Sequence, residues 1–515
     1  AAQQSRAVLG TVEFPNSGAE AAQDPFVRGV LLLHSFEYEE AAAAFREAQE
    51  RDPGFALAYW GEAMTYNHPI WMEQDRAAAL DALDRLAPSP EARLAEASGE
   101  GEKDWLRAVH VLYGVGEEAR ELGVGPGADG SPAPKEARDD AYRDFMARMH
   151  EKHRGDDEWA TFYALSILGS AHEGRDFRTY MRAAAVAEEV FDRNPDHPGA
   201  AHYVIHSFDD PIHAPLGLPA ARAYSEIAPG AAHAQHMTSH IFVAMGMWED
   251  VVEANEVARD VQNAGEREAG RPPVLCGHYT FWLEYGYLQR GRHDAAAEVM
   301  ERCHGQVAGG VRSRGRVGYF VEMRSRYLLD TETWSDVERW PLDLSGAAPG
   351  LRAHDRWLRG FAAARRGRVA EARRHLDAME ATLRGTGGGH PDLAIMADQL
   401  RGAVAVADGR TGDALPLLRA AAEAEAGLPF QFGPPAIPKP TFELLGEALL
   451  EAGRADEAAE AFATALQRTP RRTASLLGLA RAQEAAGRRA EARRTYGELA
   501  AIWSAADPGI EVVRT

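Results

Sequence analysis

A pattern with a period of 34 residues constrains the fold of this chain more than any other feature of its sequence. In the segment 441–470, small residues, an aromatic residue and a proline occupy positions 8, 20, 24, 27 and 32 of such a unit, namely Gly446, Ala458, Phe462, Ala465 and Pro470. A period of this length indicates two antiparallel helices per unit. One hairpin cannot bury its apolar faces alone, so neighbouring hairpins must stack on one another.

The same frame recurs at four other places, occupied by Ala480, Ala492 and Tyr496; by Gly29, Ala41, Phe45, Ala48 and Pro53; by Gly360 and Ala372; and by Gly402 and Ala414. With these matches the chain resembles the tetratricopeptide repeat (TPR) superfamily over most of its length. The resemblance implies an all-α, TPR-like α-solenoid, a right-handed superhelix of helical hairpins. It also implies a concave groove lined by the first helix of each hairpin.

The frame predicts seven segments along the chain. They are an extended N-terminal segment (1–21), N-terminal TPR-like repeats (22–85), an insertion with a Gly/Pro loop (86–155), His-rich central repeats (156–306), a degenerate hairpin (307–350), C-terminal TPR repeats (351–506) and a tail (507–515). The loop of the insertion contains a GxGxxG pattern from Gly125 to Gly130. No strand is expected before it, so we interpret this match as chance.

Histidines are concentrated in the central repeats. Seven of the 19 histidines lie within the 44 residues from His197 to His240, where an even distribution would place fewer than two. Prolines at 195 and 229 are 34 residues apart and set three units, at about 164–197, 198–231 and 232–265. In this frame two neighbouring units carry histidines at the same positions, 5 and 9.

These spacings predict a metal site. Residues four apart share one face of a helix, and neighbouring helices pack with their axes 8–10 Å apart. Two imidazoles from each of two helices can therefore meet at one ion, and the expected ligands are His202, His206, His236 and His240. Imidazole donors favour copper or zinc. The HExxH motif, with its built-in glutamate base, is absent from the sequence.

Other residues near this block are candidates for additional ligands or for hydrogen-bond acceptors that fix an imidazole tautomer. They are His172, His233, His278, Asp209, Asp210 and His213. A competing interpretation is that the histidines only line a wet groove and that Asp-Asp-Pro only ends a helix, because Pro211 disfavours helical backbone at the residue before it. His197 precedes Pro198 and is expected to cap a helix or to lie on the surface.

The His-rich block carries a second, narrower resemblance. Its pattern H-x4-HYxIHxxDxP-x-HA, followed by HAxHMxSHIFxxxGxW, spans residues 197–255. It is similar to a group of bacterial TPR proteins of unassigned activity, many of them exported. This resemblance implies the fold and a special role for the histidines, and it implies no reaction.

Three functions remain open at this point. The first is a solenoid that binds a transition metal in its histidine-lined groove and presents a surface to a ligand or a protein partner. The second is a structural scaffold that assembles through its end repeats. The third is a His-ligated metalloenzyme, a hydrolase or an oxidoreductase, with three histidine ligands and one open position for water.

The net charge, the apolar runs and the cysteine content limit the partners and the cellular location that can be expected. The formal net charge of −22 argues against nucleic-acid binding, and no apolar run approaches the 18 residues that a transmembrane helix requires. The first residues, "AAQQSRAVLG", are typical of a mature N-terminus after cleavage, so we expect an extracytoplasmic protein, periplasmic or secreted. Cys276 and Cys303 form no CxxC pair. They exclude a disulfide framework and a cysteine zinc site and are expected to be small buried residues, with their bonding left open.

Overall fold

The computed structural model describes residues 8–310, 313–385 and 390–510, and helices account for nearly all of their regular structure. The helices of the first part are α1 (Glu20–His34), α2 (Tyr38–Arg51), α3 (Ala56–Met64), η1 (Pro69–Trp71), α4 (Arg76–Leu86), α5 (Pro90–Glu96), α6 (Glu100–Tyr113), α7 (Gly116–Glu121), α8 (Lys135–Lys152), α9 (Asp157–Leu168), α10 (Phe177–Arg193), α11 (Pro198–Phe208) and α12 (Ala214–Ile227). Two strands of two residues each, β1 (Asn67–His68) and β2 (Glu73–Gln74), pair antiparallel around η1.

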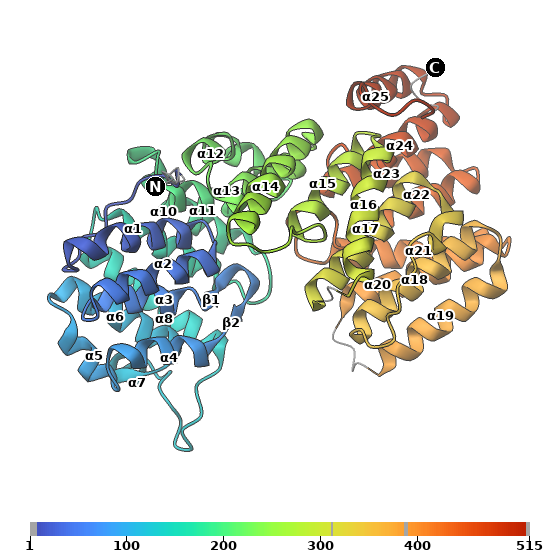
Figure 1. The fold of residues 1–515 in the computed structure, drawn as a ribbon. Helices are drawn as coiled ribbons and strands as arrows, with labels where there is room; N and C mark the ends of the chain where they lie inside the picture. Colours follow the sequence, from blue (N-terminus) through green and yellow to red (C-terminus); the bar gives the residue numbers. More distant parts are fainter. Residues whose placement is uncertain (1–7, 311–312, 386–389, 511–515) are drawn as a thin grey trace. The chain divides into compact units, whose positions relative to one another are not determined.

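The later helices are α13 (Ala232–Met245), α14 (Trp248–Glu268), α15 (His278–Gln289), α16 (His293–Ala308), α17 (Arg314–Thr331), η2 (Trp334–Glu338), α18 (Pro349–Arg365), α19 (Val369–Arg384), α20 (Pro391–Ala407), α21 (Thr411–Ala426), α22 (Thr441–Glu451), α23 (Ala455–Arg468), α24 (Thr473–Ala485) and α25 (Arg489–Ile502). Within each compact part many consecutive helices pack against one another as hairpins, for example α1 with α2 and α18 with α19 (Figure 1). The predicted all-α class is therefore confirmed.

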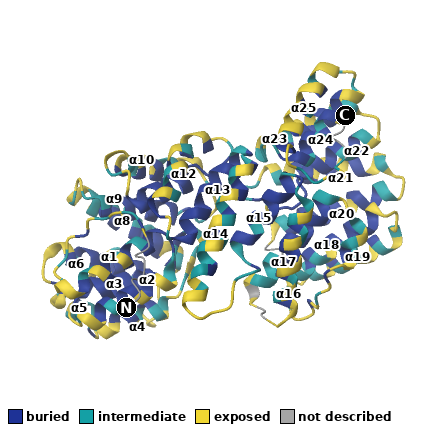
Figure 2. Cartoon of the chain, turned by 45° about the horizontal axis from the view of Figure 1, so that its top comes forward, coloured by how far each residue is buried: buried dark blue, intermediate teal, exposed yellow. Residues whose placement is uncertain are grey.

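The chain folds into two compact units. One comprises residues up to Asp209 together with His213–Ile241, and the other comprises Asp210–Ile212 together with the residues from Phe242 onward. In both units the residues that the helices turn toward each other are buried and the opposite faces are exposed (Figure 2). Helices of this kind are stabilised mainly by the burial of one apolar face.

The turn inside each hairpin explains one recurring glycine. Six hairpins turn through a glycine with φ between 65° and 79°, a left-handed conformation that glycine adopts without steric penalty. These residues are Gly246, Gly291, Gly367, Gly409, Gly453 and Gly487. In the turn between α1 and α2 a phenylalanine, Phe36, takes this conformation, with φ of 54°.

A second recurring contact explains the aromatic residue of the repeat. Phe462 of α23 lies between two glycines, and a Cβ added at Gly446 or Gly478 would lie 2.8 Å or 2.2 Å from its ring. Phe45 of α2 sits in the same way between two glycines of α1 and α3, where added Cβ atoms would lie 2.7 Å and 2.3 Å away. The glycines thus let three consecutive helices close around one ring.

The segments that departed from the repeat frame are also helical. The segment 86–155 contains α5, α6, α7 and α8, and its Gly/Pro loop at 123–134 forms only turns and irregular chain. The segment 307–350 contains α17 and η2. Residues 8–19 form no helix or strand, and residues 1–7 of the expected extended segment lie outside the described part.

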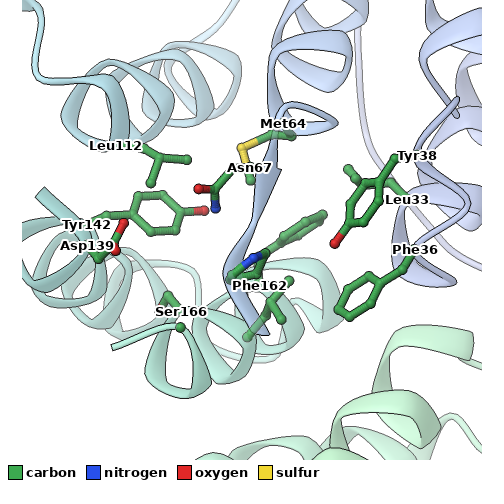
Figure 3. A pocket seen from close by; sticks show the side chains of 13 residues that line it. Leu33, Phe36, Tyr38, Met64, Asn67, Leu112, Asp139, Tyr142, Phe162 and Ser166 are labelled. Atoms are coloured by element: carbon green, nitrogen blue, oxygen red, sulfur yellow. The ribbon is translucent and has the colours of Figure 1, made fainter. Parts of the chain in front are cut away.

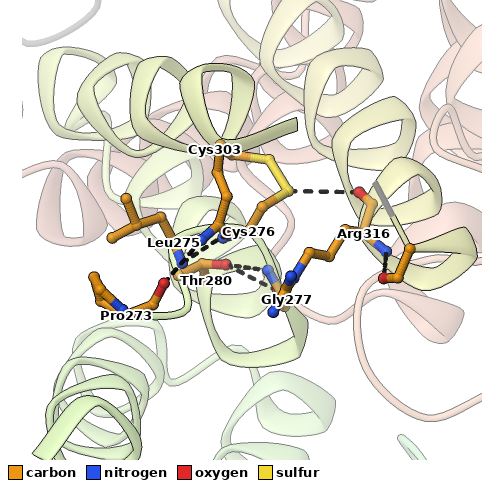
Figure 4. Close-up of a disulfide and its surroundings, with 9 residues drawn as sticks. Pro273, Leu275, Cys276, Gly277, Thr280, Cys303 and Arg316 are labelled. Atoms are coloured by element: carbon orange, nitrogen blue, oxygen red, sulfur yellow. Dashed lines mark hydrogen bonds between the residues drawn. A yellow bond between two sulfur atoms is a disulfide. The ribbon is translucent and has the colours of Figure 1, made fainter. Parts of the chain in front are cut away.

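The two cysteines are joined. Cys276, just before α15, and Cys303, on α16, form a disulfide and are both fully buried (Figure 4). Next to the disulfide, the backbone N–H of Gly277 donates to Thr280 Oγ1 at 2.8 Å and fixes the start of α15. The expectation of small buried residues holds for their burial, and the bond adds a covalent link between α16 and the start of α15. Among the described helices, none combines the length and the apolarity needed to span a bilayer.

Candidate metal centre

Two helices supply the histidines of the site. His202 and His206 lie on α11, and His233, His236 and His240 lie on α13, and all five side chains are buried. The sequence fixes the limits of α11. His197 is its N-cap residue, with its Nδ1 accepting from the Ala200 N–H at 3.2 Å, and α11 ends at Phe208, ahead of the Asp-Asp-Pro turn.

One group of three imidazoles can converge on a single ion. One donor nitrogen from each of His202, His206 and His233 lies within 4.8 Å of the other two. The ring centroids of His202 are 4.9 Å from His206 and 5.1 Å from His233. Donors bonded to one tetrahedral ion lie about 3.3 Å apart for bonds of 2.0–2.1 Å, so the three rings must move closer together to bind one ion.

Hydrogen bonding fixes the tautomer of His202. Its Nδ1 lies 2.6 Å from the backbone carbonyl of His34, and a carbonyl can only accept, so we assign the proton to Nδ1. Its Nε2 then carries a lone pair, and this buried atom has no hydrogen-bond partner among the described residues. Burial lowers the pKa of His202 to about 3, so the ring is neutral at pH 7, as a metal ligand must be.

A buried carboxylate joins the two histidine helices. Asp209 Oδ2 accepts from His240 Nδ1 at 2.9 Å and lies 3.4 Å from His206 Nδ1, while Oδ1 forms an ion pair with Arg175. A carboxylate that accepts from Nδ1–H directs the Nε2 lone pair of the same ring toward a metal. Burial lowers the pKa of His206 well below its ordinary value, and the neighbouring His202 and Arg175 lower it further.

Two further imidazole nitrogens face each other on α13. His236 Nε2 lies 3.2 Å from His240 Nε2, and the two ring centroids are 5.1 Å apart. The edge of the His240 ring also meets His206, at a centroid distance of 5.4 Å. The structure therefore places the four predicted ligands in one continuous histidine cluster, and it adds His233, which the sequence offered only as a further candidate.

Behind His202 lies a buried network that the sequence did not reveal. Glu158 of α9 accepts from His34 Nε2 at 2.8 Å and from His197 Nε2 at 3.1 Å. His34 Nδ1 lies 2.9 Å from the Tyr203 hydroxyl, which donates to it in this arrangement. Burial alone would raise the pKa of Glu158, but the two histidines outweigh it and bring the pKa to about 2. The network holds the end of α1, whose last carbonyl orients His202.

Phe36 closes the cluster from the side of α1. Its ring centroid lies 4.3 Å from that of His202, 5.6 Å from His233 and 5.9 Å from His206. The residue holds its left-handed backbone at the hairpin position that glycine occupies in six other turns. Such a conformation costs a non-glycine residue about 1–2 kcal/mol, and residues of this kind concentrate at functional sites.

Four of the predicted supporting residues are not part of the group formed by His202, His206 and His233. His172 was expected at position 9 of a helix, but α9 ends at Leu168, and His172 sits in the following turn with its Nε2 3.5 Å from Asp140 Oδ1. His213 precedes α12 and its ring meets Phe177 at 4.7 Å. Asp210 accepts from the Ile212 N–H at 2.9 Å. His278 begins α15 in the second unit, with its Nδ1 3.2 Å from the Tyr319 hydroxyl.

Phe36, which contacts the cluster, also lines a small cavity. Its lining includes Phe36, Tyr38, Met64, Asp139 and Tyr142 (Figure 3). Its volume of about 20 Å³ holds about one water molecule. The Tyr38 hydroxyl is buried there with no hydrogen-bond partner among the described residues. The cavity is therefore too small for an organic substrate.

Only one signal in the sequence points to the residues missed. Phe36 stands where the other hairpins place glycine, which marks it as unusual in the repeat frame. His34, Glu158 and Arg175 lie outside the His-rich block at 197–255, and no spacing relates them to it. Only the fold brings them together.

Comparison with known proteins supports the repeat architecture at one place in the chain. Residues 449–502 match the model of the tetratricopeptide repeat family. No curated protein matches this sequence. Solved structures that align with the chain include the TPR domain of P58(IPK), at 12% identity over 91% of this chain and 98% of that one, with a TM-score of 0.23.

Two further structures align over most of their length. Yeast Tom70 shares 10% identity over 91% of this chain and 96% of its own, with a TM-score of 0.35. The APC/C hetero-tetramer Cut9-Hcn1 shares 12% identity over 98% of this chain and 77% of that chain, with a TM-score of 0.32. The helices α23, α24 and α25, which lie within residues 449–502, thus form a tetratricopeptide repeat segment in an all-α chain of helical hairpins.

Proposed function

We propose that this helical-hairpin protein binds a transition-metal ion through His202, His206 and His233. The observation that carries the proposal is the Nε2 atom of His202. It is buried, it carries a lone pair because Nδ1 donates to the His34 carbonyl, and none of the described residues hydrogen-bonds to it. A buried polar nitrogen left in this state costs free energy, and a bound cation removes that cost.

The donor set supports copper or zinc. All three donors are imidazole nitrogens, which suit both ions, and copper(II) binds such donors more tightly than zinc by intrinsic order. Three protein ligands leave a fourth position for water, as in catalytic zinc sites. This open position keeps a hydrolase or oxidoreductase activity as an alternative function of the same ion.

The test compares two single variants with the wild-type chain. Metal-free protein is titrated with zinc or copper at pH 7 by calorimetry, and the His202→Ala variant is expected to bind at least about tenfold more weakly, or roughly 1.4 kcal/mol. The matched control is His172→Ala, which removes a histidine of the same unit that lies outside the cluster. Equal affinities in all three proteins would refute the site.

We propose partner binding as a second function, located in the second unit. The tetratricopeptide repeat match at 449–502 supports it, together with a cavity of about 440 Å³ that includes Asp330, Phe462, Arg481 and Trp503 in its lining. Cavities of this size accommodate side chains or small ligands, and the lining combines both charges with apolar surface. Peptides selected from a display library by the wild-type chain should fail to bind Arg481→Glu, in which an exposed positive charge is reversed. If no peptide is selected and the chain self-associates instead, the scaffold alternative takes its place.

We also propose an extracytoplasmic location. The buried disulfide between Cys276 and Cys303 supports it, because such bonds persist in oxidising compartments and are rare in the cytosol. Alkylation of denatured, unreduced protein from its native cell should add no mass at the cysteines. Addition of two alkyl groups would contradict this location.

A further inference from the structure

The proposed ion leaves a second pair of imidazoles unused. His236 and His240 are 0% and 1% exposed, and their Nε2 atoms lie 3.2 Å apart. Two bare nitrogen lone pairs repel each other at this distance. A proton or a cation must therefore lie between them.

The state of His240 is fixed by its other ring nitrogen. Its Nδ1 lies 2.9 Å from Asp209 Oδ2, and Asp209 is held as a carboxylate by its ion pair with Arg175. We therefore assign the proton of His240 to Nδ1, so that Nε2 presents a lone pair toward His236. Donors on one tetrahedral ion lie about 3.3 Å apart, and the observed 3.2 Å matches this separation without any ring movement.

Asp209 relates this pair to the first donor group. The same oxygen, Oδ2, lies 2.9 Å from His240 Nδ1 and 3.4 Å from His206 Nδ1. The Nε2 atoms of the two rings are on the far side of each imidazole from this oxygen. His206 forms one donor group with His202 and His233, His240 lies 3.2 Å from His236, and Asp209 lies within reach of both His206 and His240.

We infer that His236 and His240 hold a second transition-metal ion next to the first, an inference that rests on the proposed function. The class of ligand is a divalent copper or zinc ion, bound by two neutral imidazoles and completed by water or by an oxyanion. Paired ions of this kind can clamp both oxygens of a displacement reaction, which a single ion cannot do. Asp209 acts as a positioning residue for both ions.

Zinc alone serves as the probe for the test. Metal-free full-length chain is loaded at pH 7 and passed through a desalting column, and bound zinc is counted by elemental analysis. Two equivalents are expected in the wild type and in the control His172→Ala. His236→Ala and His240→Ala should each retain one equivalent, and His202→Ala should retain the other. His236→Asn, which keeps a polar side chain, replaces the alanine variant if the latter unfolds.

The outcomes separate the second ion from the first. One equivalent in the wild type that His236→Ala leaves unchanged would show that the pair is an N–H···N hydrogen bond and overturn the inference alone. One equivalent that both His202→Ala and His236→Ala abolish would show a single shared ion and also overturn it. No bound zinc in the wild type would overturn the proposed function together with the inference. As a second readout, loading with copper(II) should give a magnetically coupled pair, whose resonance signal falls as the second equivalent binds.

Discussion

Replacing Asp209 with asparagine tests how the carboxylate supports the histidine cluster. The carboxylate accepts a hydrogen bond from His240 Nδ1 at 2.9 Å and forms an ion pair with Arg175, and the Asp209 side chain is fully buried. Asparagine keeps one acceptor oxygen but turns an N–H₂ group toward either the guanidinium or an imidazole N–H. In either arrangement an N–H donor of asparagine faces another N–H donor. The hydrogen bond that fixes the tautomer of His240 is therefore lost.

Two effects of different size should follow. Removing a carboxylate partner of a metal-ligating histidine typically lowers metal affinity 10- to 100-fold, which is about 1.4–2.7 kcal/mol. Leaving a buried charge without its partner costs about 3–5 kcal/mol of folding free energy. Arg175 also donates to the carbonyls of His206 and Ser207, at 3.2 Å and 3.3 Å. We therefore expect a stability loss near 3 kcal/mol, at the lower end of that range.

Calorimetric titration with zinc at pH 7 measures the affinity, and urea unfolding of the metal-free protein measures the stability. Asp104→Asn is the matched control, because Asp104 is a buried carboxylate that accepts from His153 at 2.9 Å and pairs with Arg107 and Lys152 away from the cluster. It should lose stability and keep full metal affinity. The reasoning is refuted if Asp209→Asn binds zinc within twofold of wild type, or if both variants lose affinity equally.

Three other changes probe the fold. Burial lowers the pKa of His110 to about 3. Below pH 6.5 this histidine therefore binds a proton in the unfolded chain but not in the folded chain, and the stability falls as the pH drops from 6.5 toward 3. His110→Leu should therefore gain about 2 kcal/mol relative to wild type between pH 7 and pH 5 in urea unfolding; an unchanged difference would contradict the assignment. Replacing Cys276 and Cys303 with serine opens a link across 27 residues and should remove up to about 3.5 kcal/mol, whereas an unchanged melting curve would show that the link adds no stability. Arg472→Met removes the buried ion pairs with Asp330 and Glu443 and should cost about 3–5 kcal/mol, and a loss below 1 kcal/mol would show that Lys439, which also pairs with Glu443, is a sufficient partner.

The repeat frame predicted the hairpins because the residues that specify a hairpin lie close together in the sequence. Six hairpins have a glycine at the turn, and two aromatic rings each lie against a pair of glycines, and both features act between neighbouring helices in the sequence. The same frame placed His202 and His206 on the first helix of one unit and His236 and His240 on the first helix of the next unit. These positions hold because residues four apart share a helix face wherever the helix lies.

The rest of the site depends on contacts that no period encodes. His34 and Glu158 lie on α1 and α9, and only tertiary packing brings them beside His202. His172 does not lie on a helix as the frame implied, because α9 ends at Leu168 and the chain turns there. Asp209 and Asp210 are adjacent acidic residues, and the sequence alone could not say which of them faces the imidazoles.

The contact between Phe462 and its two glycines has a consequence for how such a chain changes over generations. A methyl group at residue 478 would overlap the ring, at 2.2 Å, so alanine there becomes tolerable only after Phe462 has been replaced by a smaller residue. Once both glycines have drifted to alanine, the phenylalanine can no longer return. The three positions therefore accept substitutions in one order, with Phe462 changing before either glycine. Each hairpin junction built in this way restricts the order in which its own residues can change.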